Sequence, residues 1–175
     1  MMSRTLLLVA GFLASIFPAH AQTDALVVAA PLNWLTFEDA LTSATASGRA
    51  VLVDVYAPWC PWCARLQNEV YSVDSVQTYL EANFEIARIN IEEAEDVIAF
   101  KGFSLTSAEL AAGLGAEATP TTVFLDANGD YITRLPGFVD AGEFLHILRY
   151  IGSKSFKVES YKDFRSRQVI PAMDH

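Results

Sequence analysis

Cys60 and Cys63 are the only cysteines of the chain, and two residues separate them. A Cys-x-x-Cys pair can cycle between a dithiol and a disulfide, or it can supply half of a metal site. A disulfide that closes so short a loop removes little entropy from the unfolded chain, so a purely structural role explains the pair poorly. The spacing therefore favours thiol–disulfide chemistry.

The segments around the pair predict a strand followed by a helix. Residues 50–56 form an almost continuous apolar, β-branched run, which is typical of a strand covered on both faces. A helix predicted over residues 60–71 would place Cys60 at its N-terminus, where unpaired N–H groups and the helix dipole favour a thiolate. Pro61 would take the first helical position, where its missing N–H costs nothing. Cys63, one turn later, could resolve a mixed disulfide formed at Cys60.

The rest of the chain predicts an α/β domain in which helices cover a mixed sheet. The predicted helices span residues 34–48, 74–80, 106–114 and 140–151, and the further strands span residues 84–91, 121–125 and 131–135. Asp74, Thr106 and Asp140 are the expected helix caps. Asn128-Gly129 predicts a two-residue turn between the last two strands.

The N-terminal segment has the layout of a secretory signal peptide. Arg4 supplies a positive start, an apolar run covers residues 6–17, and Ala19 and Ala21 place small residues where a signal peptidase cleaves. The run is shorter than the roughly 20 residues of a membrane-spanning helix, and an uncleaved anchor is the alternative. We expect a signal peptide over residues 1–21, cleaved near Ala21, and a periplasmic location.

Composition limits the function classes. The formal net charge is −9 and no cluster of Lys or Arg stands out, so nucleic acid and anionic membrane surfaces are not expected partners. A chain of 175 residues, 52% of them hydrophobic, fits one domain with its own core. We expect a flexible arm over residues 22–32, one domain over residues 33–152, and a tail over residues 153–175 that could dock as a further helix.

A zinc site is not expected, because zinc takes about four protein ligands. The chain has no third cysteine, and its histidines are poorly placed: His20 leaves with the signal peptide, His146 lies in the last predicted helix, and His175 is the terminal residue. No metal is predicted. The cysteine pair would itself be the redox group, so no separate cofactor is expected.

Further residues extend the pattern around the pair. Asp54 stands six residues before Cys60, Trp59 directly precedes it, the run Ala118-Thr119-Pro120-Thr121 comes just before a strand, and Gly137 follows the next strand. With these residues the chain resembles the thioredoxin-like family over about residues 34–151. The resemblance implies a thioredoxin fold: a central mixed sheet flanked by helices, here with a helical insertion over residues 92–112, before the strand that follows Pro120.

The resemblance also implies residue roles. In the family the residue matching Asp54 helps to move protons to and from the buried cysteine, and Arg88 falls where thioredoxins carry a lysine near it. Arg88 should favour ionised Asp54 by Coulomb attraction, against the effect of burial. The residue matching Pro120 is cis and faces the cysteines, and the residue before it offers backbone hydrogen bonds to the substrate. The expected substrate-binding residues are Trp59, Pro61, Trp62, Thr119, Pro120 and Gly137.

The insertion and the tail run Tyr161-Lys162-Asp163-Phe164 are similar to periplasmic thioredoxins of the SoxW type, and the core is similar to the carboxy-terminal domain of the transmembrane reductase DsbD. These resemblances imply a membrane electron donor of the DsbD or CcdA type. They also imply disulfide-bearing exported proteins as partners. A monomer is expected.

The expected function is reduction of protein disulfides, with Cys60 as nucleophile and Cys63 as resolving thiol. Pro61-Trp62 lacks the histidine that stabilises the thiolate in oxidising relatives, which argues against a strong oxidant. A disulfide oxidant or isomerase is the first alternative. A copper-handling chaperone is the second, although such proteins normally add a nearby His or Met ligand.

Overall fold

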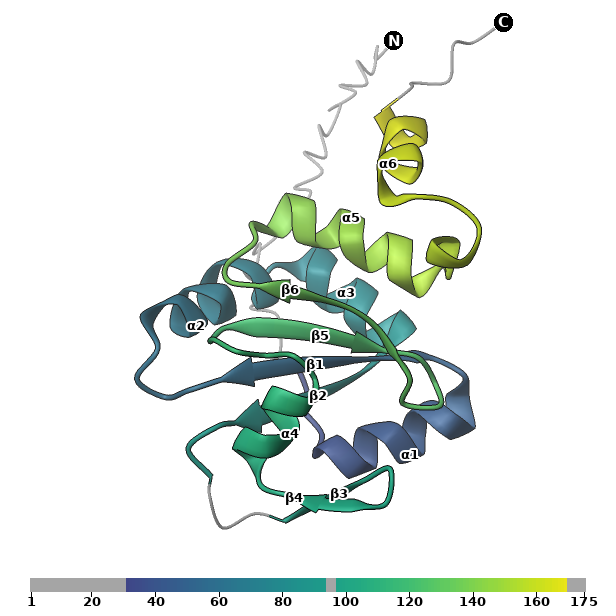
Figure 1. Ribbon diagram of the computed structural model, residues 1–175. Helices are drawn as coiled ribbons and strands as arrows, with labels where there is room; N and C mark the ends of the chain where they lie inside the picture. The colour runs from purple at the N-terminus through teal and green to yellow at the C-terminus, as the bar shows by residue number, and fades with distance from the viewer. Residues whose placement is uncertain (1–30, 94–96, 170–175) are drawn as a thin grey trace, which may run out of the picture.

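A four-stranded mixed sheet forms the centre of the computed structural model, which describes residues 31–93 and 97–169 (Figure 1). Its strands are β1 (Ala50–Tyr56), β2 (Phe84–Asn90), β5 (Thr121–Leu125) and β6 (Tyr131–Pro136), in the order β2-β1-β5-β6. β1 runs parallel to β2 and antiparallel to β5, and β6 runs antiparallel to β5. The predicted mixed sheet is confirmed.

Helices cover both faces of this sheet (Figure 1). They are α1 (Phe37–Ser47) and α4 (Ser107–Gly113) on one face, and α2 (Pro61–Leu66), α3 (Asp74–Asn83) and α5 (Ala141–Gly152) on the other. β1 sends Val51, Val53 and Val55 into the first core, and Ala50 and Leu52 into the second. This double burial explains the continuous apolar run, and the alternation of side chains along a strand directs position 54 toward the α2 face.

The helix that begins after Cys60 changes its winding part-way. α2 is followed without a break by a π-helical turn, η1 (Gln67–Tyr71), so the two together span residues 61–71 of the predicted 60–71, with Cys60 as the N-cap. A π turn has i→i+5 hydrogen bonds in place of the α-helix's i→i+4. Tyr71, at its end, is fully buried and packs edge-on against Trp34 and Phe144, with ring centroids 5.2 and 5.6 Å away.

One predicted helix start and one predicted helix cap are wrong. The first helix begins at Phe37 and not at Trp34, because Leu35 bridges to Ala87 beside β2 and Thr36 caps the helix by accepting the Asp39 N–H. Asp74 is not a cap: Val73 holds that position without a side-chain bond, and Asp74 lies in the first turn. A carboxylate there is still favourable, because it faces the positive end of the helix dipole. Gly48 ends the first helix as expected.

The insertion contains a hairpin as well as a helix. β3 (Ile98–Phe100) and β4 (Phe103–Leu105) pair through a turn at Lys101-Gly102, where both residues have positive φ, as a type I′ turn requires. α4 follows with the predicted Thr106 cap, completed by Glu109 in a capping box. The helical part of the prediction is confirmed, and the strands were missed because each has only three residues.

The turn between β5 and β6 is longer than predicted. The Asp126 N–H donates to the Asp130 carbonyl, so three residues and not two reverse the chain. The Asp126 carboxylate accepts the N–H groups of both Asn128 and Asp130, which stabilises this wider loop. Gly129 still supplies the positive φ that the turn needs.

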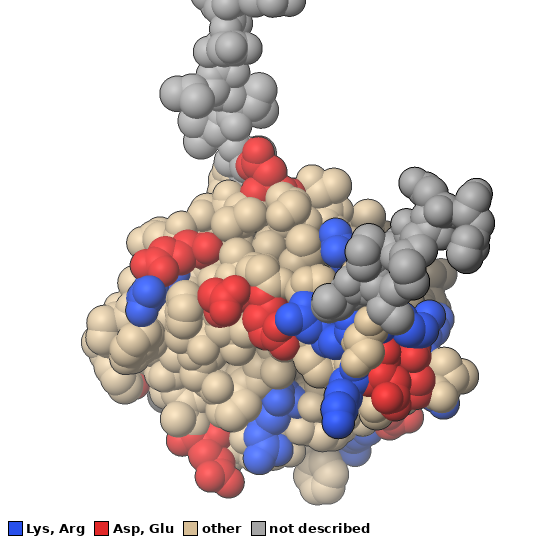
Figure 2. Space-filling view, turned by 90° about the horizontal axis from the view of Figure 1, so that it is seen from above, with Lys and Arg blue, Asp and Glu red and all other residues tan. Residues whose placement is uncertain are grey.

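After α5, a short 3-10 turn η2 (Ser155–Lys157) leads into α6 (Tyr161–Val169). α6 docks on α5 through Phe164, whose ring centroid lies 5.3 Å from that of Tyr150. On the face that carries α5, Lys and Arg side chains lie beside Asp and Glu side chains, in keeping with the Glu143–Arg165 ion pair (Figure 2).

The predicted signal peptide and most of the predicted arm lie outside the described residues. Across residues 31–93 and 97–169, no helix combines the length and the apolar character that a membrane crossing requires.

Candidate active site

Cys60 and Cys63 form a disulfide at the start of α2, with their Cα atoms 5.3 Å apart. Cys60 is the N-cap residue, and its sulfur accepts the N–H of Cys63 at 3.1 Å. Pro61 follows at the first helical position, as predicted. A helix N-terminus stabilises negative charge on an atom that accepts its free N–H groups, so the same contact would stabilise a Cys60 thiolate.

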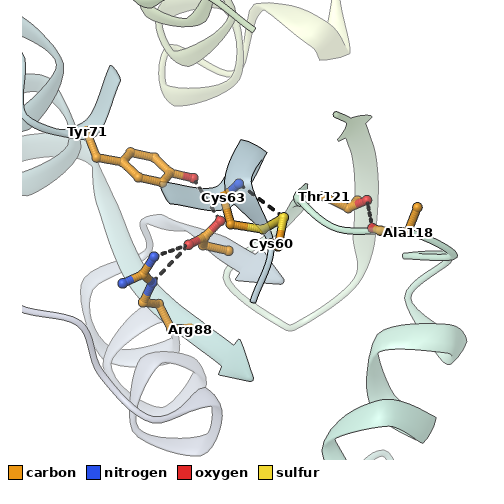
Figure 3. Close-up of a disulfide and its surroundings, with 7 residues drawn as sticks. Cys60, Cys63, Tyr71, Arg88, Ala118 and Thr121 are labelled. Carbon is orange, nitrogen blue, oxygen red and sulfur yellow. Dashed lines mark hydrogen bonds and ion pairs between the residues drawn. A yellow bond between two sulfur atoms is a disulfide. The ribbon is translucent and has the colours of Figure 1, made fainter. Parts of the chain in front are cut away.

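The carboxylate of Asp54 is held by partners on both of its oxygens. Arg88 donates from Nε (2.9 Å) and Nη2 (2.8 Å) to Oδ2, and the Tyr71 hydroxyl donates to Oδ1 at 3.3 Å. Figure 3 shows Tyr71 and Arg88 on the same side of the disulfide, with these bonds as dashed lines. The sheet register explains the arrangement, because Arg88 on β2 and Thr122 on β5 lie directly opposite Asp54. The predicted Asp54–Arg88 pair is confirmed.

Burial dominates the electrostatics of Asp54, whose exposed fraction is 1%. Desolvation raises the pKa of Asp54 above its ordinary value, although the charge and hydrogen bond of Arg88 and the bond from Tyr71 oppose this. Burial, followed by the nearby Asp54 charge, also raises the pKa of Tyr71. Tyr71 therefore stays protonated and remains a donor. Asp54 is better suited to accept a proton than an exposed aspartate is.

Two aromatic rings hold the Arg88 guanidinium in place. Its central carbon lies 4.8 Å from the ring centroid of Trp34 and 4.4 Å from that of Tyr56. Cation–π contacts of this kind fix the plane of the guanidinium as well as its position.

Exposed aromatic side chains stand beside the disulfide. Trp59 and Trp62 are 67% and 50% exposed, whereas Cys60 and Cys63 are 4% and 5% exposed. The Trp62 ring lies 5.9 Å from that of Phe138, which follows Gly137.

Arg65 packs over both of these rings. Its guanidinium carbon lies 5.2 Å from the centroid of Trp62 and 4.5 Å from that of Phe138, and its Nε donates to the Glu69 carboxylate at 2.9 Å. The rim beside the cysteines therefore combines the aromatic rings of Trp62 and Phe138 with the Arg65–Glu69 ion pair.

The segment before β5 forms the other side of the site. The Thr119–Pro120 peptide bond is cis, as the family resemblance implied. Gly137, with φ of 81°, donates its N–H to the Pro120 carbonyl at 2.8 Å. The Thr121 hydroxyl donates to the Ala118 carbonyl, and Figure 3 shows these two residues on the far side of the disulfide from Tyr71 and Arg88. The backbone N–H and C=O of Thr119 have no hydrogen-bond partner among the described residues.

The comparison with known proteins decides the family. A family model described as a thioredoxin-like domain matches residues 37–152. The chain belongs to the thioredoxin-like family. A solved thioredoxin from Thermus thermophilus is 32% identical, with a TM-score of 0.57 over 71% of this chain and 90% of that one. A thioredoxin-fold protein from Helicobacter pylori, at 22% identity and a TM-score of 0.59 over 69% of this chain and 80% of that one, supports the fold.

Among curated relatives, the thiol:disulfide interchange protein DsbD of Yersinia pestis is 34% identical over 109 residues. The match covers 61% of this chain and 16% of that protein, so the chain spans only a small part of its relative's length. The thioredoxin-like chain is thus related to thiol–disulfide oxidoreductases and carries a Cys-x-x-Cys disulfide.

The fold brings most of the expected site residues to one region, but sequence reasoning missed Tyr71, Thr122, Arg65 and Phe138. Tyr71 lies at the end of a π turn, and the spacing of apolar residues does not predict such a turn. A usable signal was present: Tyr71 and Val70 are apolar, while Asn68 and Glu69 directly before them are polar. No cluster of three or more His, Cys, Asp or Glu suited to a metal occurs in the described part of the chain.

Proposed function

We propose that this protein reduces disulfide bonds of exported proteins in the periplasm, with Cys60 as nucleophile and Cys63 as resolving thiol. The observation that carries the proposal is the disulfide at the N-terminus of α2, with exposed tryptophans beside it and the buried Asp54 on the preceding strand. The kinship with thiol:disulfide interchange proteins supports the same chemistry.

The reaction would proceed in two exchanges. The Cys60 thiolate attacks one sulfur of the substrate disulfide, that S–S bond breaks, and one substrate thiolate leaves and takes a proton from water. The Cys63 thiol then gives its proton to Asp54, and its thiolate attacks the Cys60 sulfur. The second substrate thiolate leaves and is protonated, and the Cys60–Cys63 disulfide forms. Two electrons have passed from the pair to the substrate.

The surface beside the cysteines would hold the substrate in an extended conformation. The backbone N–H and C=O of Thr119, which bond to none of the described residues, offer a donor and an acceptor to a substrate strand. Pro61 and Pro120 would line the floor beside the disulfide, and Gly137 would leave room for a substrate backbone. Trp59 and Trp62 would cover the substrate side chains next to its disulfide.

A donor must return two electrons to the pair after each turnover. The relationship to DsbD supports a membrane dithiol of the DsbD or CcdA type in this role, and the N-terminal signal-like segment supports export. The cysteine pair would be the only redox group, and no metal would take part.

The reduction potential of the Cys60–Cys63 pair tests the direction of electron flow. Pro61-Trp62 supplies no histidine to stabilise the thiolate, so we expect a potential near that of thioredoxin, about −270 mV. Equilibration in glutathione buffers, with the dithiol fraction followed by alkylation and mass spectrometry, measures it. A potential near that of the oxidant DsbA, about −120 mV, would instead assign the protein to disulfide formation.

The Trp62→Ala variant tests the exposed rim. Loss of the ring that packs on Arg65 and Phe138 should lower kcat/KM for insulin reduction about tenfold, mainly through KM, because exposed aromatic anchors contribute strongly to protein contacts. Reduction of hydroxyethyl disulfide, which is too small to reach the rim, should change less than about twofold. The matched control is Phe103→Ala, another solvent-exposed aromatic, which lies on the β3–β4 hairpin. Equal losses with both substrates would rule out a role in protein recognition.

A further inference from the structure

Tyr71 makes a buried hydrogen-bond chain that the proposed reaction leaves without a role. Its hydroxyl lies 3.3 Å from Asp54 Oδ1 and 3.3 Å from Thr122 Oγ1, and all three residues are almost fully buried. An ionised carboxylate can only accept, so the single proton of Tyr71 goes to Asp54. The Thr122 hydroxyl must then donate to the Tyr71 oxygen.

The two oxygens of Asp54 differ in what they can do. Oδ2 accepts from Arg88, which always carries its proton and can only donate. Oδ1 faces the Tyr71 hydroxyl, which can donate or accept. A proton that arrives on Oδ1 can therefore be accommodated if the chain reverses, so that Asp54 donates to Tyr71 and Tyr71 donates to Thr122.

We infer that Tyr71 is a positioning residue that acts through Asp54: its hydroxyl orients the carboxylate, leaves Oδ1 as the oxygen that takes the proton of Cys63, and helps to set the pH at which that transfer occurs. The inference deepens the proposed function and rests on it for the step at Cys63. The Thr122 hydroxyl can either donate to Tyr71 or accept from it. Tyr71 can therefore donate to ionised Asp54 and accept from protonated Asp54.

The surroundings of Asp54 leave few other groups to play this part. Arg88 approaches from β2, Tyr71 from η1 and Thr122 from β5, while the cysteine pair lies at the N-terminus of α2. The bond from Tyr71 to an ionised carboxylate is charge-assisted and so stronger than the bond between the neutral groups. Burial raises the pKa of Asp54, and Tyr71 opposes that rise. Removing the hydroxyl should therefore make Asp54 hold its proton to higher pH.

The Tyr71→Phe variant tests the inference, because it removes the hydroxyl and keeps the ring that packs on Trp34 and Phe144. We expect the Asp54 carboxyl titration, followed by 13C NMR, to move upward by about half to one pH unit. The pH profile of insulin reduction should move in the same direction by a similar amount. Thr122→Val, which removes only the second bond of the chain, should give a smaller shift of the same sign and serves if Tyr71→Phe does not fold.

Tyr79→Phe is the matched control, since Tyr79 lies on α3 and packs against Phe84, away from the hydrogen bonds that join Asp54, Tyr71 and Thr122. This variant should change neither the Asp54 titration curve nor the pH profile of insulin reduction. An unchanged Asp54 titration in Tyr71→Phe, or a shifted titration with an unchanged activity profile, would overturn the inference while the reductase function stood. A wild-type protein that reduces no disulfide would remove the proposed function, and the carboxyl titration would still decide whether Tyr71 controls Asp54.

Discussion

Replacing Cys60 with serine is expected to lower disulfide reduction by about 10³-fold or more, to the uncatalysed background. A serine hydroxyl is not ionised near neutral pH, and it cannot form the mixed disulfide on which the exchange depends. The N-cap position tolerates the change well, because serine is a favoured N-cap residue and its oxygen can accept the Cys63 N–H. The loss should therefore appear in turnover of insulin, with an unchanged far-UV circular dichroism spectrum.

Cys63→Ser is the matched control for this loss. It keeps the nucleophile and removes the resolving thiol, so it should accumulate a covalent complex between Cys60 and the substrate. Mass spectrometry and a gel run without reductant detect that complex. If Cys63→Ser turned over normally, or if Cys60→Ser trapped the same complex, the assigned roles would be reversed or wrong. Stoichiometric copper binding by the wild type, with no reductase activity, would favour the chaperone alternative.

Replacing Asp54 with asparagine is expected to lower the rate of disulfide reduction by about 10²-fold near neutral pH, the usual contribution of a general base. Asparagine keeps the shape of the side chain: its oxygen can accept from Arg88 and its NH2 group can donate to the Tyr71 hydroxyl, but it cannot take the proton of Cys63. Single-turnover kinetics should place the loss in the second exchange, after the mixed disulfide has formed. Rates that match the wild type at every pH would remove Asp54 from the mechanism.

The same variant should be more stable than the wild type at neutral pH. Burial raises the folded-state pKa of Asp54 above the ordinary 3.8, so the folded state holds a proton that the unfolded state has already lost. Stability therefore falls as pH rises from about 3.8 to the folded-state pKa, and the deficit persists above it. Asparagine does not ionise, so Asp54→Asn does not lose this stability as the pH rises. Urea unfolding from pH 3 to 8 should show the difference between Asp54→Asn and wild type growing with pH.

The control for this stability effect is Asp130→Asn, whose carboxylate is exposed and pairs with Lys101. It should change stability little at any pH, because surface ion pairs contribute little. A gap between Asp54→Asn and wild type that does not depend on pH would contradict the effect of burial on Asp54.

Much of the site could be predicted because several of its residues lie close together in the sequence. Asp54, Cys60 and Pro61 occupy one strand–turn–helix unit, so their spacing alone places them. The pairing of Arg88 with Asp54 followed from the family resemblance, and the register of the parallel strands β1 and β2 explains it. The cis bond before Pro120 followed from the family resemblance, and no local pattern would have supplied it.

The features that could not be predicted from the sequence depend mostly on contacts with other parts of the chain. The stack of Trp62, Arg65 and Phe138 joins the helix after the cysteines to the loop after β6, and no sequence period links those elements. Leu35 was predicted as helical because its apolar spacing fits a helix, yet pairing with Ala87 decided its conformation. At Asn128-Gly129 the side chain of Asp126 widened a turn that the dipeptide alone makes tight.

The π turn at Gln67–Tyr71 has a consequence for how this site arose. Such a turn holds one residue more than an α-helical turn, and each residue of an α-helix rotates the next by about 100°. Deleting one residue between Leu66 and Tyr71 would let the helix run on regularly. Related chains that lack one residue here should carry a regular helix whose residue aligned with Tyr71 does not pair with Asp54, and related chains that keep this residue should retain the pair.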